Sequence, residues 1–164
     1  MSREILIEQF NTGYEENGWF AALKNAVANM TAEQALWKPQ GTEHSVWEMV
    51  YHLWYWNERW RKRYLNEKNE KGPSAISETF QAKENATDED WQEALDKLFA
   101  VMDFWKETLK NITDEKLNEP VSERYTDAWL YPLAHIMTHN AYHTGQIVII
   151  RKIAGNWDAA KGVS

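Results

Sequence analysis

An apolar stripe with helical spacing runs through residues 87–112 and limits the folds that this chain can adopt. Its members recur every three or four residues: Trp91, Leu95, Leu98, Met102, Trp105, Leu109 and Ile112. This period places them on one face of an α-helix, which must be buried against other elements. Thr87 is a suitable N-cap, and the acidic residues 88–90 complement the positive end of the helix dipole. The segment is therefore predicted to form a long amphipathic helix.

Three further segments have the same periodicity, and they cover about residues 3–29, 45–65 and 132–154. The second begins with a capping box, because Ser45 can cap the helix while Glu48, three residues later, reaches back to it. The last begins at a proline, which suits the first turn of a helix.

Glycines mark where these helices bend or stop. Gly13 and Gly18 weaken the first segment and indicate a bend or a close approach. Gly155 is a natural C-terminal stop for the last helix. The polar stretch 66–86 is expected to be a loop, and no strong strand pattern competes. We therefore expect one all-α domain over residues 1–164, a four-helix bundle.

The connections between the helices contain a repeated pattern. Thr31 and Thr113 each follow a long helix and can cap a short helical turn, which Pro39 or Pro120 then closes. Each block also precedes a segment that contains histidine. The pattern suggests two helix pairs related by a pseudo-twofold axis, and chance similarity is the alternative. The long connections also allow some sequential helices to lie parallel.

The composition excludes several classes of site. There is no cysteine, so any metal must be held by imidazole and carboxylate rather than thiolate. The net charge of −7 disfavours nucleic acid and anionic membranes as partners. Bases alternate with aromatics in residues 59–64, as in some single-strand binders, but a solvated helix end explains this run better. No apolar stretch suits a signal peptide or a membrane span, so we expect a cytoplasmic protein.

The sequence has 10 tryptophans, which are expected mainly to fill the core because aromatic side chains bury large areas. Lining a substrate cavity is the alternative. Trp47, Trp54 and Trp129 are expected at the surface, where they would supply a dimer interface.

Three histidines are candidate metal ligands. His139 and His143 are four residues apart and therefore lie on one helix face, together with apolar residues. Core-facing imidazoles are costly unless their nitrogens find partners, and a metal ion is such a partner. His52 lies on the apolar face of another predicted helix. Three neutral imidazoles with one open position form a typical catalytic metal site, which acidifies a bound water or thiol.

His135 extends the histidine series by one more turn. It lies about 12 Å from His143 along the axis at ~1.5 Å per residue, so these two cannot share an ion. Either His139 and His143 or His135 and His139 form the pair, and the first lies in the middle of the apolar run. His135 then becomes a second-shell or rim group, and His44 is expected in a loop. The alternative is that all of these histidines are hydrogen-bonded core residues.

Two further residues are candidate second-shell groups. Glu48 lies one turn before His52 and could orient its ring, although capping is the simpler role. Gln146 follows His143 by three residues and could contact a bound ligand or simply pack at the helix surface. Tyr51 and Tyr142 neighbour the ligands in sequence but project about 100° away on a helix, so they receive no role. No catalytic residue is assigned.

The segments Ser45–Trp56 and His139–Ile147 together resemble the DinB-like (DinB/YfiT) superfamily. Its members have a histidine in the second helix and a His-x-x-x-His-x-Gly-Gln motif in the fourth. The chain departs from the pattern at Thr144, where the family commonly has arginine. The resemblance implies a metal-binding four-helix bundle, usually dimeric, with nickel or zinc on His52, His139 and His143.

Characterised relatives of this kind include S-transferases and isomerases that use low-molecular-weight thiols such as bacillithiol or mycothiol. The resemblance therefore implies a divalent-metal-dependent enzyme, a thiol S-transferase that acts on a small electrophile or a hydrolase. The alternative is a non-catalytic dimeric bundle whose metal or buried histidines only shape the core.

Overall fold

The computed structural model describes residues 2–69 and 71–161, which form an all-helical fold without a strand. The four long helices are α1 (Ser2–Tyr14), α4 (Val46–Tyr64), α5 (Asp88–Asn111) and α7 (Leu130–Ile153). The short ones are α2 (Leu23–Val27), α3 (Ala32–Leu36), α6 (Asp114–Asn118) and the 3-10 helices η1 (Ile76–Thr79) and η2 (Ala159–Lys161). Among the described residues, no helix is both long and apolar enough to cross a membrane.

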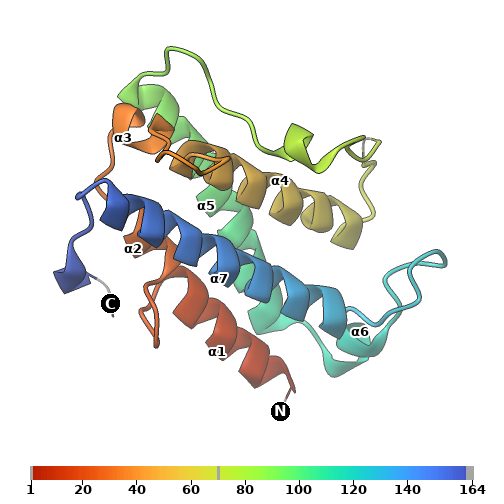
Figure 1. Cartoon of the computed structure of the whole chain (residues 1–164). Coiled ribbons are helices and arrows are strands. Elements are labelled where there is room, and N and C mark those ends of the chain that lie inside the picture. The colour runs from red at the N-terminus through yellow and green to blue at the C-terminus, as the bar shows by residue number, and fades with distance from the viewer. Residues whose placement is uncertain (1, 70, 162–164) are drawn as a thin grey trace.

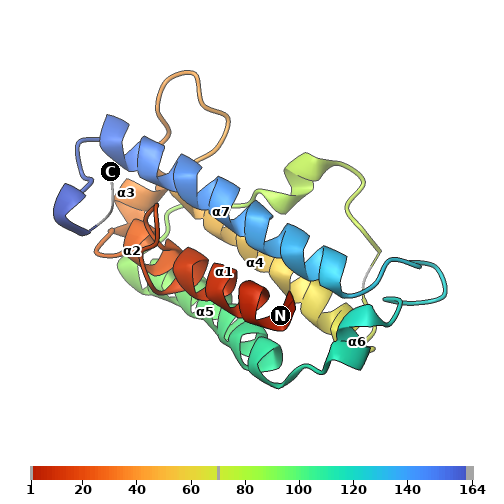
Figure 2. The ribbon, with the colours of Figure 1, turned by 90° about the horizontal axis from the view of Figure 1, so that it is seen from below.

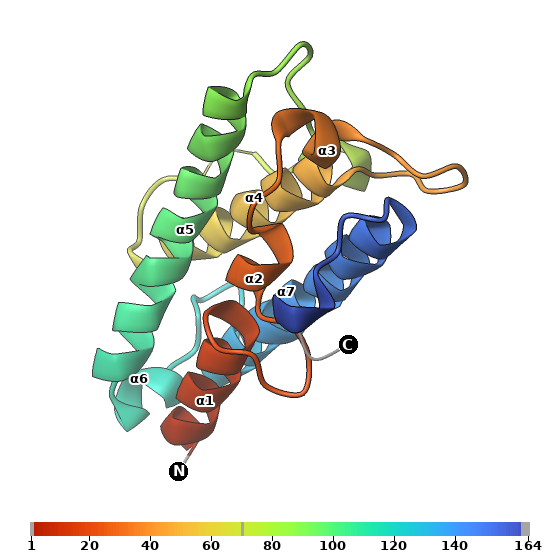
Figure 3. The same cartoon turned by 90° about the vertical axis from the view of Figure 1, so that its left-hand side faces the viewer.

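The four long helices lie alongside one another around a shared hydrophobic core (Figures 1 and 2). α1 and α4 each pack against both α5 and α7. α4 and α5 run in the same direction, because the connection, described over residues 66–69 and 71–87, returns along α4 before α5 begins (Figure 1). Figure 3 shows α3 beside the first turns of α4. In the same view, α6 lies next to the last turn of α5, far from α3. The consequence for the site is that α4 and α7 face each other.

Three of the four predicted long helices are confirmed. α4 begins with the reciprocal capping box of Ser45 and Glu48, and α5 begins with that of Thr87 and Asp90. α7 ends just before Gly155, whose φ of 71° lies in the left-handed region that favours glycine. These local signals agree with the buried faces of the helices, so sequence and packing specify the same boundaries.

The predicted first helix over residues 3–29 is wrong, because the chain leaves the helix after Tyr14 and starts α2 at Leu23. In the intervening loop, the Asn17 side-chain oxygen accepts a hydrogen bond from the Ala22 amide at 2.8 Å. A β-carbon at Gly18 would lie 3.1 Å from Cβ of Thr12, so the turn packs closely onto α1. The close approach predicted as one alternative is therefore found at Gly18, in the loop that interrupts the predicted helix, whereas Gly13 lies within α1.

The predicted surface positions of two tryptophans are also wrong. Trp47 and Trp129 are 5% and 1% exposed, and both belong to the core. Trp47 packs against Trp91 with ring centroids 5.2 Å apart, and Trp129 packs edge-on against Tyr64 at 5.1 Å. Of these three tryptophans, Trp54 alone is partly exposed. The rings of Trp47 and Trp129 are buried because they fill the space between neighbouring helices.

Candidate metal centre

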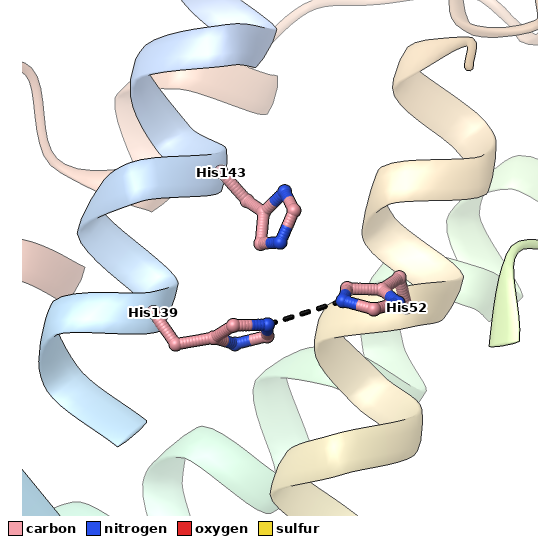
Figure 4. A group of neighbouring side chains, drawn as sticks. All are labelled: His52, His139 and His143. Atoms are coloured by element: carbon pink, nitrogen blue, oxygen red, sulfur yellow. Dashed lines mark hydrogen bonds between the residues drawn. The ribbon is translucent and has the colours of Figure 1, made fainter. Parts of the chain in front are cut away.

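The structure brings His52 of α4 together with His139 and His143 of α7 (Figure 4). Each ring offers one nitrogen, and these three atoms lie within 4.8 Å of one another. The i, i+4 spacing of the α7 pair places both rings on the helix face that is turned toward α4. The arrangement is therefore a three-imidazole cluster between two facing helices.

A hydrogen bond in this cluster joins Nε2 of His52 to Nε2 of His139 at 3.1 Å (Figure 4). Two imidazole nitrogens bound tetrahedrally to one zinc ion, each about 2.0–2.1 Å from it, would be about 3.3 Å apart. The observed separation fits a shared divalent ion with little movement of either ring.

The other nitrogen of His52 is tied to the segment that follows α4. Nδ1 of His52 lies 2.7 Å from the Thr79 hydroxyl oxygen, and that hydroxyl lies 2.6 Å from the Ile76 carbonyl. A carbonyl can only accept, so Thr79 donates to Ile76 and accepts from His52. The proton of His52 therefore lies on Nδ1, and the lone pair of Nε2 faces the cluster.

His143 is oriented in the same way from within α7. Its Nδ1 lies 2.6 Å from Oε1 of Gln146, and Nε2 of Gln146 donates to the Tyr142 hydroxyl at 3.2 Å. The amide oxygen accepts from Nδ1, which leaves the lone pair of Nε2 available to a cation. Gln146 therefore orients a histidine of the cluster.

Burial keeps these rings neutral. Desolvation lowers the pKa of His52 to about 3, and the neighbouring His143 and His139 add to the effect. Desolvation also lowers the pKa of His139 to about 4 and lowers that of His143. A metal ion requires the unprotonated imidazole, so near neutral pH the rings are in the form that binds metal.

Phe80 fixes the plane of the His52 ring. The two rings are stacked with centroids 3.9 Å apart and an angle of 10° between their planes. On its other face, Phe80 stacks against His44 with a centroid distance of 3.7 Å. His44 does lie in a loop, as expected, but this half-buried residue supports the wall of the cluster.

A buried amide pair joins α4 and α7 next to the histidines. Nδ2 of Asn57 donates to Oδ1 of Asn140 at 2.9 Å, and Nδ2 of Asn140 donates back to Oδ1 of Asn57 at 3.3 Å. Trp105 of α5 donates to the Asn57 carbonyl at 3.3 Å. Because Asn140 adjoins His139 in sequence, this pair fixes the register in which the two helices present their histidines.

A cavity of about 610 Å³ opens beside the cluster and is lined by all three histidines. Its walls come from α4, α7, the η1 segment and the loop before α7, and aromatic rings dominate them. His135 also lines it, on the exposed side one turn from His139, which agrees with a rim position. The cluster therefore has protein on some sides and open space on another.

The structure gives Glu48 a different role from orienting His52. Its carboxylate accepts from the Ser45 amide and from Nζ of Lys38, both at 2.8 Å. Nδ1 of His52 is already bonded to Thr79. The carboxylate caps α4 at its first turn, so the capping interpretation holds and the orienting one is wrong.

Sequence reasoning missed four residues of this region. Asn57 and Asn140 carried a usable signal, because each is a polar residue on an otherwise apolar helix face and needs a buried partner. Thr79 and Phe80 carried none, because they lie in a polar segment without periodicity. Only the folded arrangement shows that this segment reaches His52.

A comparison of the sequence with models of protein families shows to which family the chain belongs. The sequence model of the DinB superfamily matches residues 17–147, which include all three clustered histidines. The chain belongs to the DinB superfamily. No curated protein and no solved structure matches it. Within this DinB-like fold, Thr144 is buried and donates to the Asn140 carbonyl at 2.8 Å, so it supports α7 instead of facing the cavity.

Proposed function

We propose that the chain is a metal-dependent enzyme that holds one divalent ion, zinc or nickel, on His52, His139 and His143. The observation that carries the proposal is the shared orientation of His52 and His143. Each has its Nδ1 hydrogen-bonded to the protein, which leaves Nε2 for the cluster. Metal-binding histidines characteristically have such partners on the second nitrogen.

The chemistry of the donor set favours catalysis over a closed structural site. Three neutral imidazoles leave the full charge of a bound cation in place, so it would lower the pKa of a thiol or a water molecule. Asn57, Trp56 and Phe80 line the adjoining cavity and would exclude bulk water from that group. The cavity provides the space for a second reactant.

The reaction that fits best is transfer of a small electrophilic substrate to a low-molecular-weight thiol, with hydrolysis as the second candidate. The thiol is taken from the characterised relatives that the sequence resembles. The absence of cysteine is compatible with it, because the sulfur would come from the cosubstrate.

The finer architecture is part of the same proposal. The ring of contacts among α1, α5, α4 and α7 supports a four-helix bundle. α3 and α6 are both five-residue helices with threonine caps, Thr31 and Thr113, and each precedes a long helix that contributes to the histidine cluster. This correspondence supports the pseudo-twofold relation. A homodimer is proposed from the family resemblance, and a cytoplasmic location from the sequence pattern; sedimentation velocity of the untagged protein tests the oligomeric state.

Metal content tests the site directly. Elemental mass spectrometry on untagged protein should find about one zinc or nickel per chain, because one three-ligand cluster binds one ion. His52→Ala and His139→Ala should each lose it. His135→Ala is the matched control, since it removes an exposed histidine one turn from His139, and it should retain the metal.

Loss of metal in both ligand variants would justify a screen of thiols with electrophiles. A wild-type protein that stays free of metal after loading with excess zinc and nickel would reject the proposal. The histidines would then be hydrogen-bonded core residues of a non-catalytic bundle.

A further inference from the structure

We propose that the cavity beside the three histidines selects an uncharged, ring-containing apolar group and disfavours anionic ligands. The inference rests on the proposed function, because it names the substrate class of the same site. It concerns the part of the ligand that fills the cavity rather than the group that meets the metal.

The walls of the cavity are predominantly aromatic. Trp56 and Trp60 come from α4, Phe80 follows η1, and Tyr125 and Tyr131 come from the loop before α7 and its first turn. Aromatic faces and edges pack well against another ring, and burial of such apolar surface is favourable. A volume of about 610 Å³ is sufficient for a ligand of two or three rings.

The charges around the cavity oppose an anion. Among the described residues that line it there is no lysine or arginine, and the one carboxyl side chain is that of Asp127. An anion in this space would lose hydration without gaining a cationic partner, and it would face a carboxylate. The net charge of −7 adds a repulsive field of the same sign.

The guanidinium of Arg63 packs against the walls of the cavity. Cζ of Arg63 lies 4.5 Å from the ring centroid of Trp60 and 4.5 Å from that of Tyr125. Arg63 is absent from the lining, so it lies between two lining rings without facing the ligand. This cation–π sandwich joins α4 to the loop before α7 and holds Tyr125 as a wall.

The same loop is also fixed by its backbone. The Val121 amide donates to the Asp127 carbonyl at 3.0 Å, and the Trp129 amide donates to the Glu119 carbonyl at 3.0 Å. Tyr125 therefore extends from a closed turn, and the aromatic wall is formed before a ligand arrives.

Two naphthalene probes that differ in charge test the inference on metal-free protein. They are naphthalen-2-ylmethanol and 2-naphthoate, and isothermal titration calorimetry gives each Kd after chelation and dialysis. The neutral alcohol should bind at least about tenfold more tightly than the carboxylate, because only the carboxylate must lose its charge hydration. Removal of metal ensures that a carboxylate does not gain affinity by coordination.

Two isoleucine variants locate the binding. Ile76 lines the cavity and is 61% exposed, whereas Ile149 lies on α7 away from the cavity and is 58% exposed. Ile76→Lys should abolish the preference for the alcohol over the carboxylate, and Ile149→Lys should leave it unchanged. Equal or tighter binding of the carboxylate by the wild type would overturn the inference. Failure of the alcohol to bind, or an equal effect of both variants, would overturn it as well.

The outcome is separable from that of the proposed function. Metal content is measured on untreated protein, whereas the titrations use metal-free protein. A protein that binds metal but prefers the carboxylate would keep the proposed function and lose this inference. A protein that cannot bind metal but prefers the alcohol would lose the proposed function and keep this inference.

Discussion

At the scale of single residues, the candidate site depends on side chains that a ligand search by residue type would pass over. Thr79 is not expected to bind the metal itself, but its hydroxyl accepts a hydrogen bond from Nδ1 of His52 and donates one to the Ile76 carbonyl. It thus sets which nitrogen of His52 faces the cluster. Removal of that hydroxyl should lower the metal affinity more than it lowers the stability of the fold.

Thr79→Val should weaken metal binding by about 10–100-fold, because valine keeps the shape but cannot accept from His52. Thr79→Ser should retain most of the affinity. Competition with a zinc chelator of known affinity gives the Kd of each variant. Thr138→Val is the control, since Thr138 is an exposed residue of α7 whose hydroxyl donates to the Ala134 carbonyl of its own helix. An unchanged Kd for Thr79→Val would show that the hydroxyl does not orient the ligand.

Gln146 makes the equivalent contact to His143, and its charge can be changed with little change in shape. Gln146→Glu should tighten metal binding, because a carboxylate accepts the Nδ1 proton more strongly than an amide does. Gln146→Leu should weaken it by roughly tenfold. The same chelator competition measures both, with Tyr142→Phe as the control for the other end of the amide. Equal affinities for the Glu and Leu variants would contradict this role.

The lowered pKa values of the clustered histidines predict acid sensitivity of the metal-free protein. Unfolded histidine takes up a proton below about pH 6.5. In the folded state, burial lowers the pKa of His139 to about 4 and that of His52 to about 3. The unfolded state therefore binds more protons between these limits, and the free energy of unfolding should fall as the pH drops from about 6.5 to about 4.

Urea denaturation in the presence of a chelator at several pH values measures this dependence. His139→Gln should lose part of the decrease, because one of the depressed groups is gone. His135→Gln keeps the three clustered histidines and should show the full decrease. A stability that stays constant from pH 6.5 to 5 in the wild type would argue against buried, neutral rings.

At the scale of helices, the reciprocal amide pair of Asn57 and Asn140 sets how α4 and α7 meet. Asn57→Ala or Asn140→Ala leaves a buried amide without its partner, so each should lower the free energy of unfolding by about 1–3 kcal/mol. The double variant should cost less than the sum of the two, because the second change removes the unsatisfied group. Denaturation with urea provides the three values. Asn111→Ala is the control, since this exposed amide donates to the Glu107 carbonyl of its own helix.

The helices themselves could be predicted where local and tertiary signals coincide. α5 has a threonine cap, acidic first-turn residues and an uninterrupted stripe, and its predicted and observed limits nearly agree. The segment 3–29 has apolar spacing through residues 20–30 but no cap at its true interruption. The loop depends on the hydrogen bond from the Ala22 amide to the Asn17 side chain, which can be seen only in the folded chain. Periodicity alone therefore predicted one helix where the structure has two.

The candidate site, like the helices, could be predicted only in part from the sequence. Histidines on helix faces follow a period that can be read from the sequence, and the three rings do meet. Thr79 and Phe80 reach His52 from a segment without periodicity, across 27 residues in the case of Thr79. The position of such a segment depends on the tertiary packing, which the local sequence does not encode.

At the scale of the whole molecule, the cluster joins parts of the chain that are far apart in sequence. His52 and His139 are separated by 87 positions, and Thr79 ties the η1 segment to the same ring. An ion bound here would hold α4 and α7 together only while both are folded, because the unfolded chain does not bring these ligands near one another. Metal binding should therefore stabilise the entire fold rather than one loop.

Free zinc at a hundred times its Kd should add about 2.7 kcal/mol to the free energy of unfolding. For a chain of this length, that corresponds to a rise in Tm of roughly 5–10 °C. Differential scanning calorimetry with and without zinc measures the rise, and chelation should reverse it. His139→Ala should show no rise, whereas His135→Ala should show the full one, because only the first variant removes a ligand of the cluster. A rise that persists in His139→Ala would mean that zinc stabilises the fold from a different position, and the link between the three histidines and global stability would be lost.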